Sequence, residues 1–300
     1  VPSVTSYRNV SGKLITNLES GDVSRLIARG WKAPIPVNVK AHDGKTDIYG
    51  LVFTPTTMDP DKKYPVIDYI YPGPQGGSVG SWSFSASRGD HQALAELGFI
   101  VVMIEGTSNP FRSKSFHDMS YGNMADNTLP DQITAIKQLA QTFPIDTSKV
   151  GIWGHSGGGF ATAAAMFRYP DFFKVGIAES GNHDNRNYED DWGERYNGLV
   201  ENSDYAAQAN QNYAKNLKGK LLLAHGMMDN NVPPSNTLLV VDALIKANKD
   251  FDLLLFPNSA HGFGQFSPYM MRKRWDYFVK HLLNAEPPKQ FGLRGTTPAN

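Results

Sequence analysis

One short stretch, from Lys149 to Phe160, constrains the fold more than any other part of the chain. It reads K-V-G-I-W-G-H-S-G-G-G-F and is followed by alanine-rich sequence typical of a helix. The apolar residues before the glycines predict a buried strand, so the order is strand, sharp turn, helix. Glycine two positions before and two positions after Ser156 lets strand and helix approach without Cβ clashes. The pattern G-x-S-x-G in this setting predicts a nucleophile elbow with Ser156 at its tip.

The same glycines have two other interpretations. They are also compatible with an ordinary glycine-rich loop, or with a phosphate cradle at the start of a helix. No G-K-S or G-K-T follows them, so the P-loop pattern fails. The elbow is favoured because the sequence predicts a strand before the serine and a helix after it.

Strands and helices alternate on both sides of this stretch. The segment from Pro34 to Thr54, with Asp43-Gly44 in the middle, predicts an antiparallel hairpin, and Tyr64 to Tyr71 predicts a third strand. The alternation then continues through His91–Leu97, Phe99–Ile104, Ile133–Phe143, the elbow, Val175–Ala178, Leu221–Ala224, Thr237–Ala247, Phe251–Phe256 and Met270–Leu283. We therefore expect an α/β-hydrolase fold, with a mainly parallel eight-stranded sheet and helices on both faces.

The beginning of the chain has mixed character. We expect a strand at Ile15–Leu18 and a short helix at Ser20–Ala28, begun by a Ser or Asp cap. Residues 1–30 are therefore predicted to form a linker or N-terminal extension.

The remaining chain divides into a catalytic domain and a tail. We expect the domain over residues 31–288 and a flexible tail over residues 289–300, which are rich in Pro, Gly and Thr. Residues 181–211 are polar and aromatic and interrupt the alternation. We predict that they form an insertion over the active site.

Composition excludes several classes of function. Lys plus Arg and Asp plus Glu number 29 each, so no net charge favours nucleic acid or an anionic membrane. The chain has no cysteine, which excludes disulfides, thiolate metal sites and a cysteine nucleophile. No apolar run is long enough to span a membrane, and no H-E-x-x-H spacing suggests a metal. We expect a soluble protein without metal or other cofactor; its compartment stays open, with the periplasm or secretion among the options.

Two later loops supply partners for the serine. A serine hydroxyl needs an imidazole base that a carboxylate orients, and in this fold the chain order is Ser, acid, His. Asp229 follows the strand Leu221–Ala224, and His261 follows the next strand, Phe251–Phe256. The alternative role for Asp229 is to cap the following helix, a position that suits Ser235 better. The other seven histidines fit the position of the base less well.

Acyl transfer also needs hydrogen-bond donors for the oxyanion. The N–H of Gly157, at the start of the elbow helix, is one candidate. The second donor is expected from the loop after the third strand, where Tyr71 stands. The alternative role for Tyr71 is an aromatic anchor at the end of a strand.

With these residues assembled, the chain resembles the catalytic domain of the prolyl oligopeptidase family of serine peptidases, most closely the dipeptidyl peptidase IV branch. The resemblance covers roughly residues 31–288 and rests on five segments: K-Y-P-V-I-D-Y-I-Y-P-G-P at 63–74, G-H-S-G-G-G at 154–159, E-R-Y-N-G-L at 194–199, H-G-M-M-D-N-N-V at 225–232 and A-H-G at 260–262. It implies the roles of oxyanion tyrosine, nucleophile, acid and base for Tyr71, Ser156, Asp229 and His261. It also implies a first substrate subsite, an aromatic slot shaped for proline, built from Tyr188, Trp192, Asn231 and Val232.

The chain departs from that family in two respects. The family often has an aromatic residue after the serine, whereas Gly157 leaves that wall of the subsite open. Full-length relatives also carry a β-propeller before the hydrolase domain, and residues 1–30 look like the linker that would join one. The resemblance leaves a homodimer open.

We therefore expect a serine hydrolase that works through an acyl-enzyme on short peptides, after proline or alanine. The alternative is a carboxylesterase that acts on acetyl or feruloyl esters with the same triad. A non-catalytic binding module would be expected to lack a triad residue, and none is missing.

Overall fold

The computed structural model describes residues 2–79 and 84–293, and its main body is an eight-stranded sheet. The strands are β3 (Ile35–Lys40), β4 (Asp47–Phe53), β5 (Tyr64–Tyr69), β6 (Ile100–Ile104), β7 (Ile145–His155), β8 (Phe173–Glu179), β9 (Lys220–Gly226) and β10 (Asp252–Phe256). They lie in the order β10-β9-β8-β7-β5-β6-β4-β3. Strands β5 to β10 run parallel, and β4 pairs antiparallel with both β3 and β6. The predicted α/β-hydrolase fold is confirmed.

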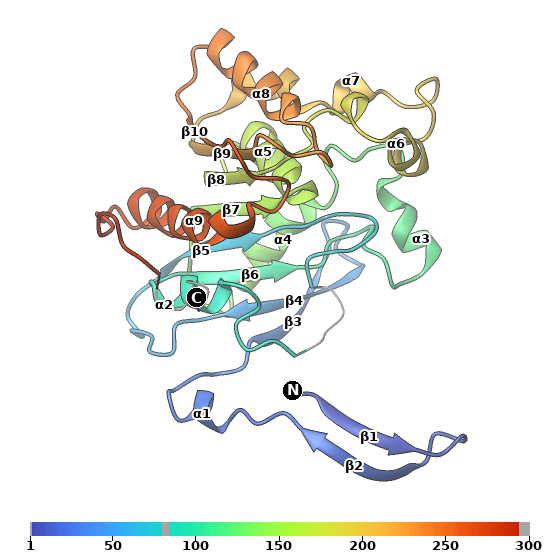
Figure 1. The fold of residues 1–300 in the computed structure, drawn as a ribbon, viewed down its shortest axis with the longest axis vertical. Coiled ribbons are helices and arrows are strands. Elements are labelled where there is room, and N and C mark those ends of the chain that lie inside the picture. The colour runs from blue at the N-terminus through green and yellow to red at the C-terminus, as the bar shows by residue number, and fades with distance from the viewer. Residues whose placement is uncertain (1, 80–83, 294–300) are drawn as a thin grey trace.

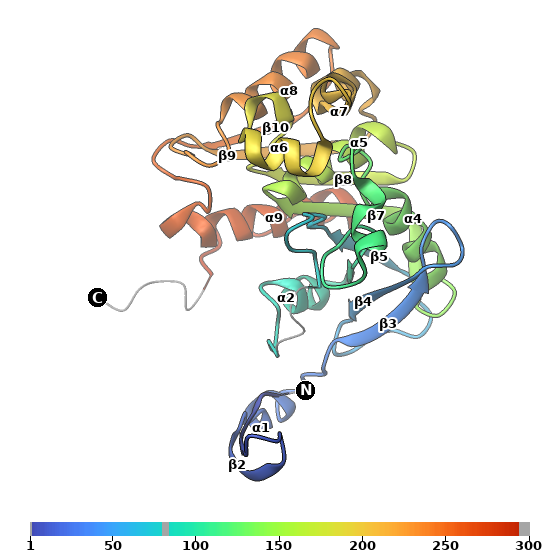
Figure 2. The same ribbon diagram turned by 90° about the vertical axis from the view of Figure 1, so that its right-hand side faces the viewer.

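Helices cover both faces of this sheet (Figures 1 and 2). One apolar core lies against α2 (His91–Glu96) and α9 (Ser267–Leu282). The other lies against α4 (Leu129–Leu139), α5 (Gly157–Arg168) and α8 (Ser235–Lys246). Because side chains alternate along a strand, Val66 belongs to the second core and its neighbour Ile67 to the first. The near-continuous apolar strands of the sequence are therefore those of a sheet buried on both faces.

Shorter helices occupy the loops beyond the carboxyl ends of the strands. They are α3 (Lys114–His117), α6 (Asp190–Asn197) and α7 (Tyr205–Gln208). Figure 1 shows α3 and α6 on the same side of the molecule. Proline occupies the first turn of α4 and of α9, where its missing N–H costs no helical hydrogen bond.

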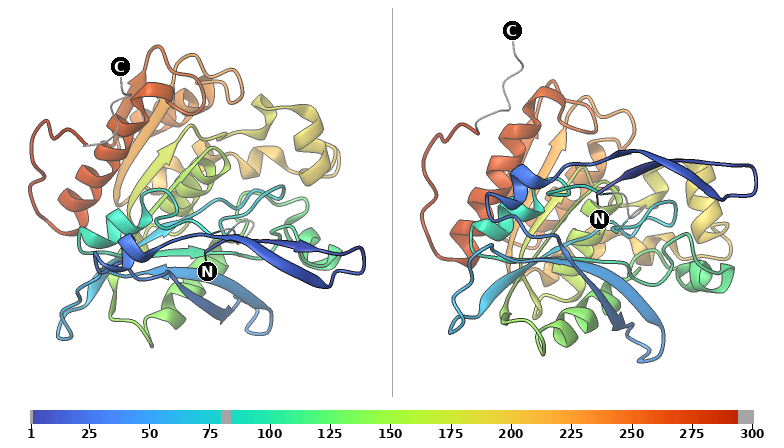
Figure 3. Two further views of the ribbon diagram at one scale, coloured as in Figure 1. Left: turned by 60° about the horizontal axis from the view of Figure 1, so that its bottom comes forward. Right: turned by 90° about the horizontal axis from the view of Figure 1, so that it is seen from below.

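The N-terminal residues form a separate element. Strands β1 (Val4–Arg8) and β2 (Leu14–Ser20) make an antiparallel hairpin that extends beside the body of the molecule (Figures 1 and 3). The sequence pattern missed β1, and the helix expected over Ser20–Ala28 is wrong in extent. Ser20 ends β2, and the helix is a single turn, α1 (Ser24–Ile27). The carboxylate of Asp22 accepts a hydrogen bond from the N–H of Ser24, which makes a local turn in place of the predicted cap.

The C-terminal end follows α9. Residues 294–300 of the predicted tail lie outside the described part of the chain. Within residues 2–79 and 84–293, none of the helices combines the length and the apolar character that crossing a bilayer requires.

Candidate active site

Ser156 lies at the sharp turn between β7 and α5. Its φ and ψ angles are 60° and −120°, a strained conformation for a residue with a side chain, and its N–H donates to the carbonyl of Glu179 (2.8 Å). A Cβ atom on Gly154 would lie 2.3 Å from the carbonyl oxygen of Ile70, and one on Gly158 would lie 2.2 Å from the same atom. Both positions therefore need glycine for the close approach of strand and helix.

Asp229 and His261 meet at the carboxyl ends of β9 and β10. Nδ1 of His261 lies 2.7 Å from Oδ2 of Asp229, whose side chain is fully buried. Oδ1 of Asp229 accepts hydrogen bonds from the N–H groups of Asn231 (3.0 Å) and Val232 (2.9 Å). Because a carboxylate only accepts, Nδ1 of His261 carries the proton and Nε2 is left to take one.

A second histidine supports the same carboxylate. Nε2 of buried His225 lies 3.2 Å from Oδ2 of Asp229 and 3.0 Å from the carbonyl oxygen of Val232. Both are acceptors, so the ring proton lies on Nε2, and Nδ1 accepts from the hydroxyl of Thr237 (2.7 Å). Burial lowers the pKa of His225, which favours this neutral form. Sequence reasoning considered His225 only as a base and missed this contact, although its place four residues before Asp229 was a signal.

The histidine next to the serine contacts the candidate base. The rings of His155 and His261 have centroids 4.6 Å apart and planes inclined by 61°. The ring of His155 also lies 5.8 Å from that of Phe263. These contacts hold the loop after β10 against the tip of the elbow.

Tyr71 lies beside the first turn of α5. A Cβ atom added to Gly157 would be 3.8 Å from the Tyr71 ring, so the phenol lies against the start of the helix. Burial raises the pKa of Tyr71, which keeps its hydroxyl protonated and able to donate. That hydroxyl accepts a hydrogen bond from the side-chain amide of Gln75 (3.1 Å). The first N–H groups of α5 have no partner within the helix, so Gly157 offers a second donor.

A cavity of about 50 Å³ lies beside Ser156. Three of the residues predicted for the substrate pocket line it, namely Tyr188, Trp192 and Val232. The fourth, Asn231, does not line it, but its side-chain carbonyl accepts a hydrogen bond from the hydroxyl of Tyr188 (3.0 Å). The rings of Tyr188 and Trp192 have centroids 5.7 Å apart. Residues 181–211 thus contribute directly to the cavity.

The structure adds residues to the cavity that the sequence did not single out. They are Pro72, Gly73, Pro74, Gln75, Met124, Asn127, Phe160, Asn182 and Asn185. The side-chain carbonyl of Gln75 accepts from the indole N–H of Trp192 (3.3 Å), and so links the loop after β5 to α6. The Pro-Gly-rich sequence after Tyr71 was a general signal of a functional loop. Nothing local distinguished Asn127.

The arrangement combines a serine at an elbow, a histidine–aspartate pair and a tyrosine ring beside the first turn of α5. These are the groups that acyl transfer requires. Over the described ranges of the chain, no cluster of three or more His, Asp or Glu side chains has a geometry that would hold a metal ion.

Comparisons with known proteins agree with this geometry. Residues 82–285 match the family model described as the prolyl oligopeptidase family. The chain is 30% identical over 222 residues to human dipeptidyl peptidase 8, a match that covers 71% of this chain and 24% of that protein. It is 28% identical over 230 residues to mouse prolyl endopeptidase FAP, with 74% of this chain and 30% of that protein covered.

A solved structure matches over most of the chain. The crystal structure of Porphyromonas gingivalis dipeptidyl peptidase 4 superposes with a TM-score of 0.81 at 27% identity and covers 93% of this chain and 40% of that one. The chain thus spans about a quarter to two fifths of the length of these relatives. From its sequence, its fold and these matches, the chain belongs to the prolyl oligopeptidase family, in the dipeptidyl peptidase IV branch.

Proposed function

We propose that the chain is the catalytic domain of a serine peptidase that cleaves short peptides through an acyl-enzyme. The observation that carries the proposal is the 2.7 Å contact between His261 and Asp229, beside the elbow that presents Ser156. The names of the relatives, a dipeptidyl peptidase and a prolyl endopeptidase, support a peptidase over an esterase.

Each catalytic side chain has one role in this mechanism. Oγ of Ser156 attacks the substrate carbonyl carbon while its proton passes to Nε2 of His261. The C–N bond then breaks, and the same proton leaves with the amine. A water molecule attacks the acyl-enzyme in the second half of the cycle, again with His261 as base, and restores Ser156. Asp229 stays ionised and stabilises the imidazolium in both halves.

The negative charge of the tetrahedral intermediate falls on the former carbonyl oxygen. In the proposed mechanism the N–H of Gly157 and the hydroxyl of Tyr71 donate to it. Because burial raises the pKa of Tyr71, its hydroxyl stays protonated and remains a donor. Gln75 orients that hydroxyl from the same loop.

The cavity is proposed to receive the substrate side chain that precedes the cleaved bond. Tyr188, Trp192 and Val232 supply its aromatic and apolar walls, and Asn231 fixes the ring of Tyr188 through its hydroxyl. The hydrogen bond from Trp192 to Gln75 links α6 to the loop after β5 on this side of the cavity.

We further propose a division of the full-length protein. Residues 31–288 act as the catalytic domain, residues 181–211 as an insertion over the site, and residues 1–30 as the connection to an N-terminal β-propeller. The small separate sheet of β1 and β2 and the greater length of the relatives support it. A chain that starts at residue 31 is expected to keep its activity, and light scattering of the full-length protein would test whether it forms the homodimer that the resemblance leaves open.

The first experiment compares substrates side by side. The rates of hydrolysis are measured for a Gly-Pro anilide, for blocked Ala and Pro anilides, and for p-nitrophenyl and feruloyl esters, with Ser156→Ala as the matched control. We expect anilide turnover that Ser156→Ala abolishes. Turnover of the esters alone, also lost in Ser156→Ala, would replace the peptidase proposal with a carboxylesterase.

A further inference from the structure

One glutamine joins the proposed oxyanion donor to the wall of the substrate cavity. Tyr71, Gln75 and Trp192 all line the cavity beside the proposed nucleophile. The side-chain nitrogen of Gln75 lies 3.1 Å from the hydroxyl oxygen of Tyr71, and its side-chain oxygen lies 3.3 Å from the indole nitrogen of Trp192. Tyr71 lies just after β5 and Trp192 lies on α6, so the two contacts link elements from distant parts of the chain.

The orientation of the Gln75 amide is fixed by Trp192. An indole N–H only donates, so the atom of Gln75 that faces it must be the carbonyl oxygen. The NH2 group is therefore the one that faces Tyr71, and because this group only donates, the phenol oxygen must accept. The hydroxyl proton of Tyr71 is not used in this contact and stays available for another acceptor.

The packing of the Tyr71 ring indicates where that proton points. A Cβ atom on Gly73 would lie 2.5 Å from Cε1 of the ring and 3.2 Å from the side-chain oxygen of Gln75, which indicates that Gln75 approaches from the Cε1 edge. A Cβ atom on Gly157 would lie 3.8 Å from Cε2, at the opposite edge. Since a phenol O–H lies in the plane of its ring, the proton is left to point toward the Cε2 edge. That edge is the side of Gly157, whose N–H is the other proposed donor.

A flipped Gln75 amide would have the opposite effect. With its carbonyl oxygen toward Tyr71, Gln75 would accept the hydroxyl proton, and the oxyanion would lose a donor. The NH2 group would then face the indole N–H of Trp192, so two donors would meet without an acceptor. Trp192 thus keeps Gln75 in the orientation that leaves the Tyr71 proton free.

A second tyrosine of the cavity shows the alternative arrangement. The hydroxyl of Tyr188 donates to the side-chain oxygen of Asn231 (3.0 Å), so its proton is already used. Tyr71 instead receives a proton from its amide partner and keeps its own. Of these two phenols, Tyr71 is therefore the one whose contact suits a donor to the substrate.

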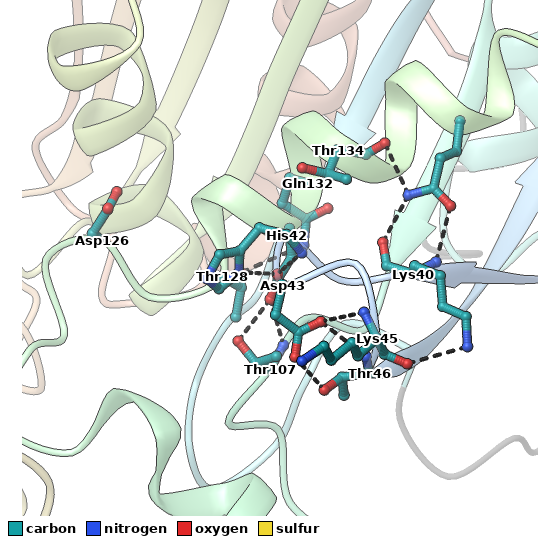
Figure 4. Close-up of polar contacts among 12 residues, drawn as sticks. Lys40, His42, Asp43, Lys45, Thr46, Thr107, Asp126, Thr128, Gln132 and Thr134 are labelled. Atoms are coloured by element: carbon teal, nitrogen blue, oxygen red, sulfur yellow. Dashed lines mark hydrogen bonds and ion pairs between the residues drawn. The ribbon is translucent and has the colours of Figure 1, made fainter.

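The loop after β5 that carries the glutamine is held from the start of α4. The main-chain carbonyl of Pro72 accepts a hydrogen bond from the side-chain amide of Asn127 (2.7 Å). The next residue, Thr128, precedes α4 (Figure 4), and in that helix the buried carboxylate of Asp131 bonds the ring and the main-chain N–H of His42. The amide between the tyrosine and the tryptophan is thus carried by a loop that another element anchors.

We propose that Gln75 and Trp192 are positioning residues for the oxyanion donor. Trp192 sets the orientation of the Gln75 amide, and Gln75 directs the hydroxyl proton of Tyr71 toward the oxyanion. Neither side chain touches the reacting atoms in this role. Trp192 then acts on turnover as well as forming a wall of the cavity. The inference rests on the proposed function and on the role of Tyr71 in it.

The sharpest test is Gln75→Glu, which keeps the length of the side chain and replaces its donor with an acceptor. Gln75 is exposed, so the new charge is not buried. A carboxylate takes the Tyr71 proton, so we expect kcat to fall by roughly 10²-fold, as in Tyr71→Phe, with KM little changed. In a Tyr71→Phe background, Gln75→Glu should cause no further loss. A loss as large as in the wild-type background would mean that the charge acts directly on the oxyanion, and would overturn the proposal.

Trp192 is tested through its N–H. Trp192→Phe keeps an aromatic wall but removes the donor that holds the amide, so Gln75 is free to flip and accept the Tyr71 proton. We expect kcat to fall by roughly three- to ten-fold, the range of one hydrogen bond. In a Gln75→Met background there is no amide to flip, so this fall in kcat should disappear, whatever the change in KM. The same fall in both backgrounds would show that Trp192 does not act through Gln75.

The measurements need a control for folding and one for the added charge. Steady-state kinetics are measured on the Gly-Pro anilide and on the p-nitrophenyl ester, and thermal melting shows that each variant is folded. Gln141→Glu, at an exposed glutamine after α4, is the matched control and should keep the wild-type kcat.

The outcomes separate this inference from the function on which it rests. A folded Gln75→Glu variant with the wild-type kcat would overturn the inference and leave the hydrolase standing. Turnover of the ester alone would overturn only the peptidase proposal, because an oxyanion also forms in ester hydrolysis and the same variants are then compared on the ester. A complete lack of turnover of both substrates by the folded wild-type chain would overturn both.

Discussion

Two buried polar regions of this molecule differ in how their groups are paired. In the first, Arg274 on α9 donates to Glu179 at the end of β8 (2.9 Å) and to Asp90 before α2 (2.6 Å), and its guanidinium lies 3.5 Å over the ring of Trp153. All three charged residues are less than 10% exposed. In the second, the cavity, Asn127 and Asn182 keep unpaired oxygens.

The difference separates scaffold from binding site. The charges around Arg274 are satisfied by one another, so they tie two helices to the sheet next to the elbow and have no capacity left for a ligand. The side-chain oxygens of Asn127 and Asn182 have no partner among the described residues, so they add little to stability. Substitutions in the first region should therefore lower the free energy of unfolding, and substitutions in the second should change turnover or selectivity.

Removal of the proposed nucleophile, Ser156, gives the largest expected effect and separates turnover most clearly from stability. We expect Ser156→Ala to lower kcat by roughly 10⁴-fold or more, because the attacking atom is lost, with no fall in the melting temperature. Steady-state kinetics and thermal melting measure both. Ser148→Ala, at an exposed serine of the same strand, is the control. Turnover near the wild-type rate in Ser156→Ala would contradict the assignment.

A substitution in the buried charged cluster around Arg274 should instead lower the free energy of unfolding. Arg274→Met leaves the buried carboxylates of Asp90 and Glu179 without their cation, so we expect a loss of about 3–5 kcal/mol of unfolding free energy. Lys246→Met breaks an exposed ion pair with Asp242 (2.6 Å), and its cost should stay below about 1 kcal/mol. Urea denaturation compares the two variants. Equal losses in both would show that the Arg274 network does not stabilise the fold.

Tyr71, the proposed oxyanion donor, is expected to act on turnover alone. Tyr71→Phe removes one donor to the developing charge, and kcat should fall by roughly 10²-fold. Tyr269→Phe, at a tyrosine that is 43% exposed, is the matched control and should have no effect. An unchanged kcat in Tyr71→Phe, with KM also unchanged, would remove Tyr71 from the mechanism.

Asp68 tests whether every unpaired buried group belongs to a binding site. It lies near the carboxyl end of β5, is fully buried without a partner for either oxygen among the described residues, and does not line the cavity. Burial raises its pKa from 3.8 to about 8, so the folded chain keeps this proton while the unfolded chain loses it between pH 4 and pH 8. Stability contributed by this group therefore falls as the pH rises through that window.

The neutral substitution removes this dependence. We compare the unfolding free energy of Asp68→Asn with that of the wild type at pH 5 and at pH 8. The difference in favour of the variant should be larger at pH 8 than at pH 5 by at least about 1 kcal/mol, with kcat unchanged. Urea denaturation at the two pH values measures the gain. The same stability difference at both pH values would mean that Asp68 does not titrate in this window.

Much of the fold was predictable because its signals are local. The elbow glycines, the apolar strand before them and the alanine-rich helix after them lie within one stretch, and the strand-helix alternation fixed the order of the remaining elements. The N-terminal segment was less predictable. Its strands are mostly exposed, so no apolar alternation identified β1, and Asp22 made a turn in place of a helix cap.

The sequence by itself determined which residues are chemically competent and in what order they occur: Ser156, then Asp229, then His261, each after a predicted strand. Only the tertiary structure decided which polar groups meet. Gln75 and Trp192 are 117 residues apart in the chain, and Asn127 reaches Pro72 across 55. Whether a buried oxygen is paired depends on the packing of several such segments at once, and no local pattern records that. The catalytic order is therefore a property of the sequence, whereas the unpaired oxygens of the cavity are a property of the fold.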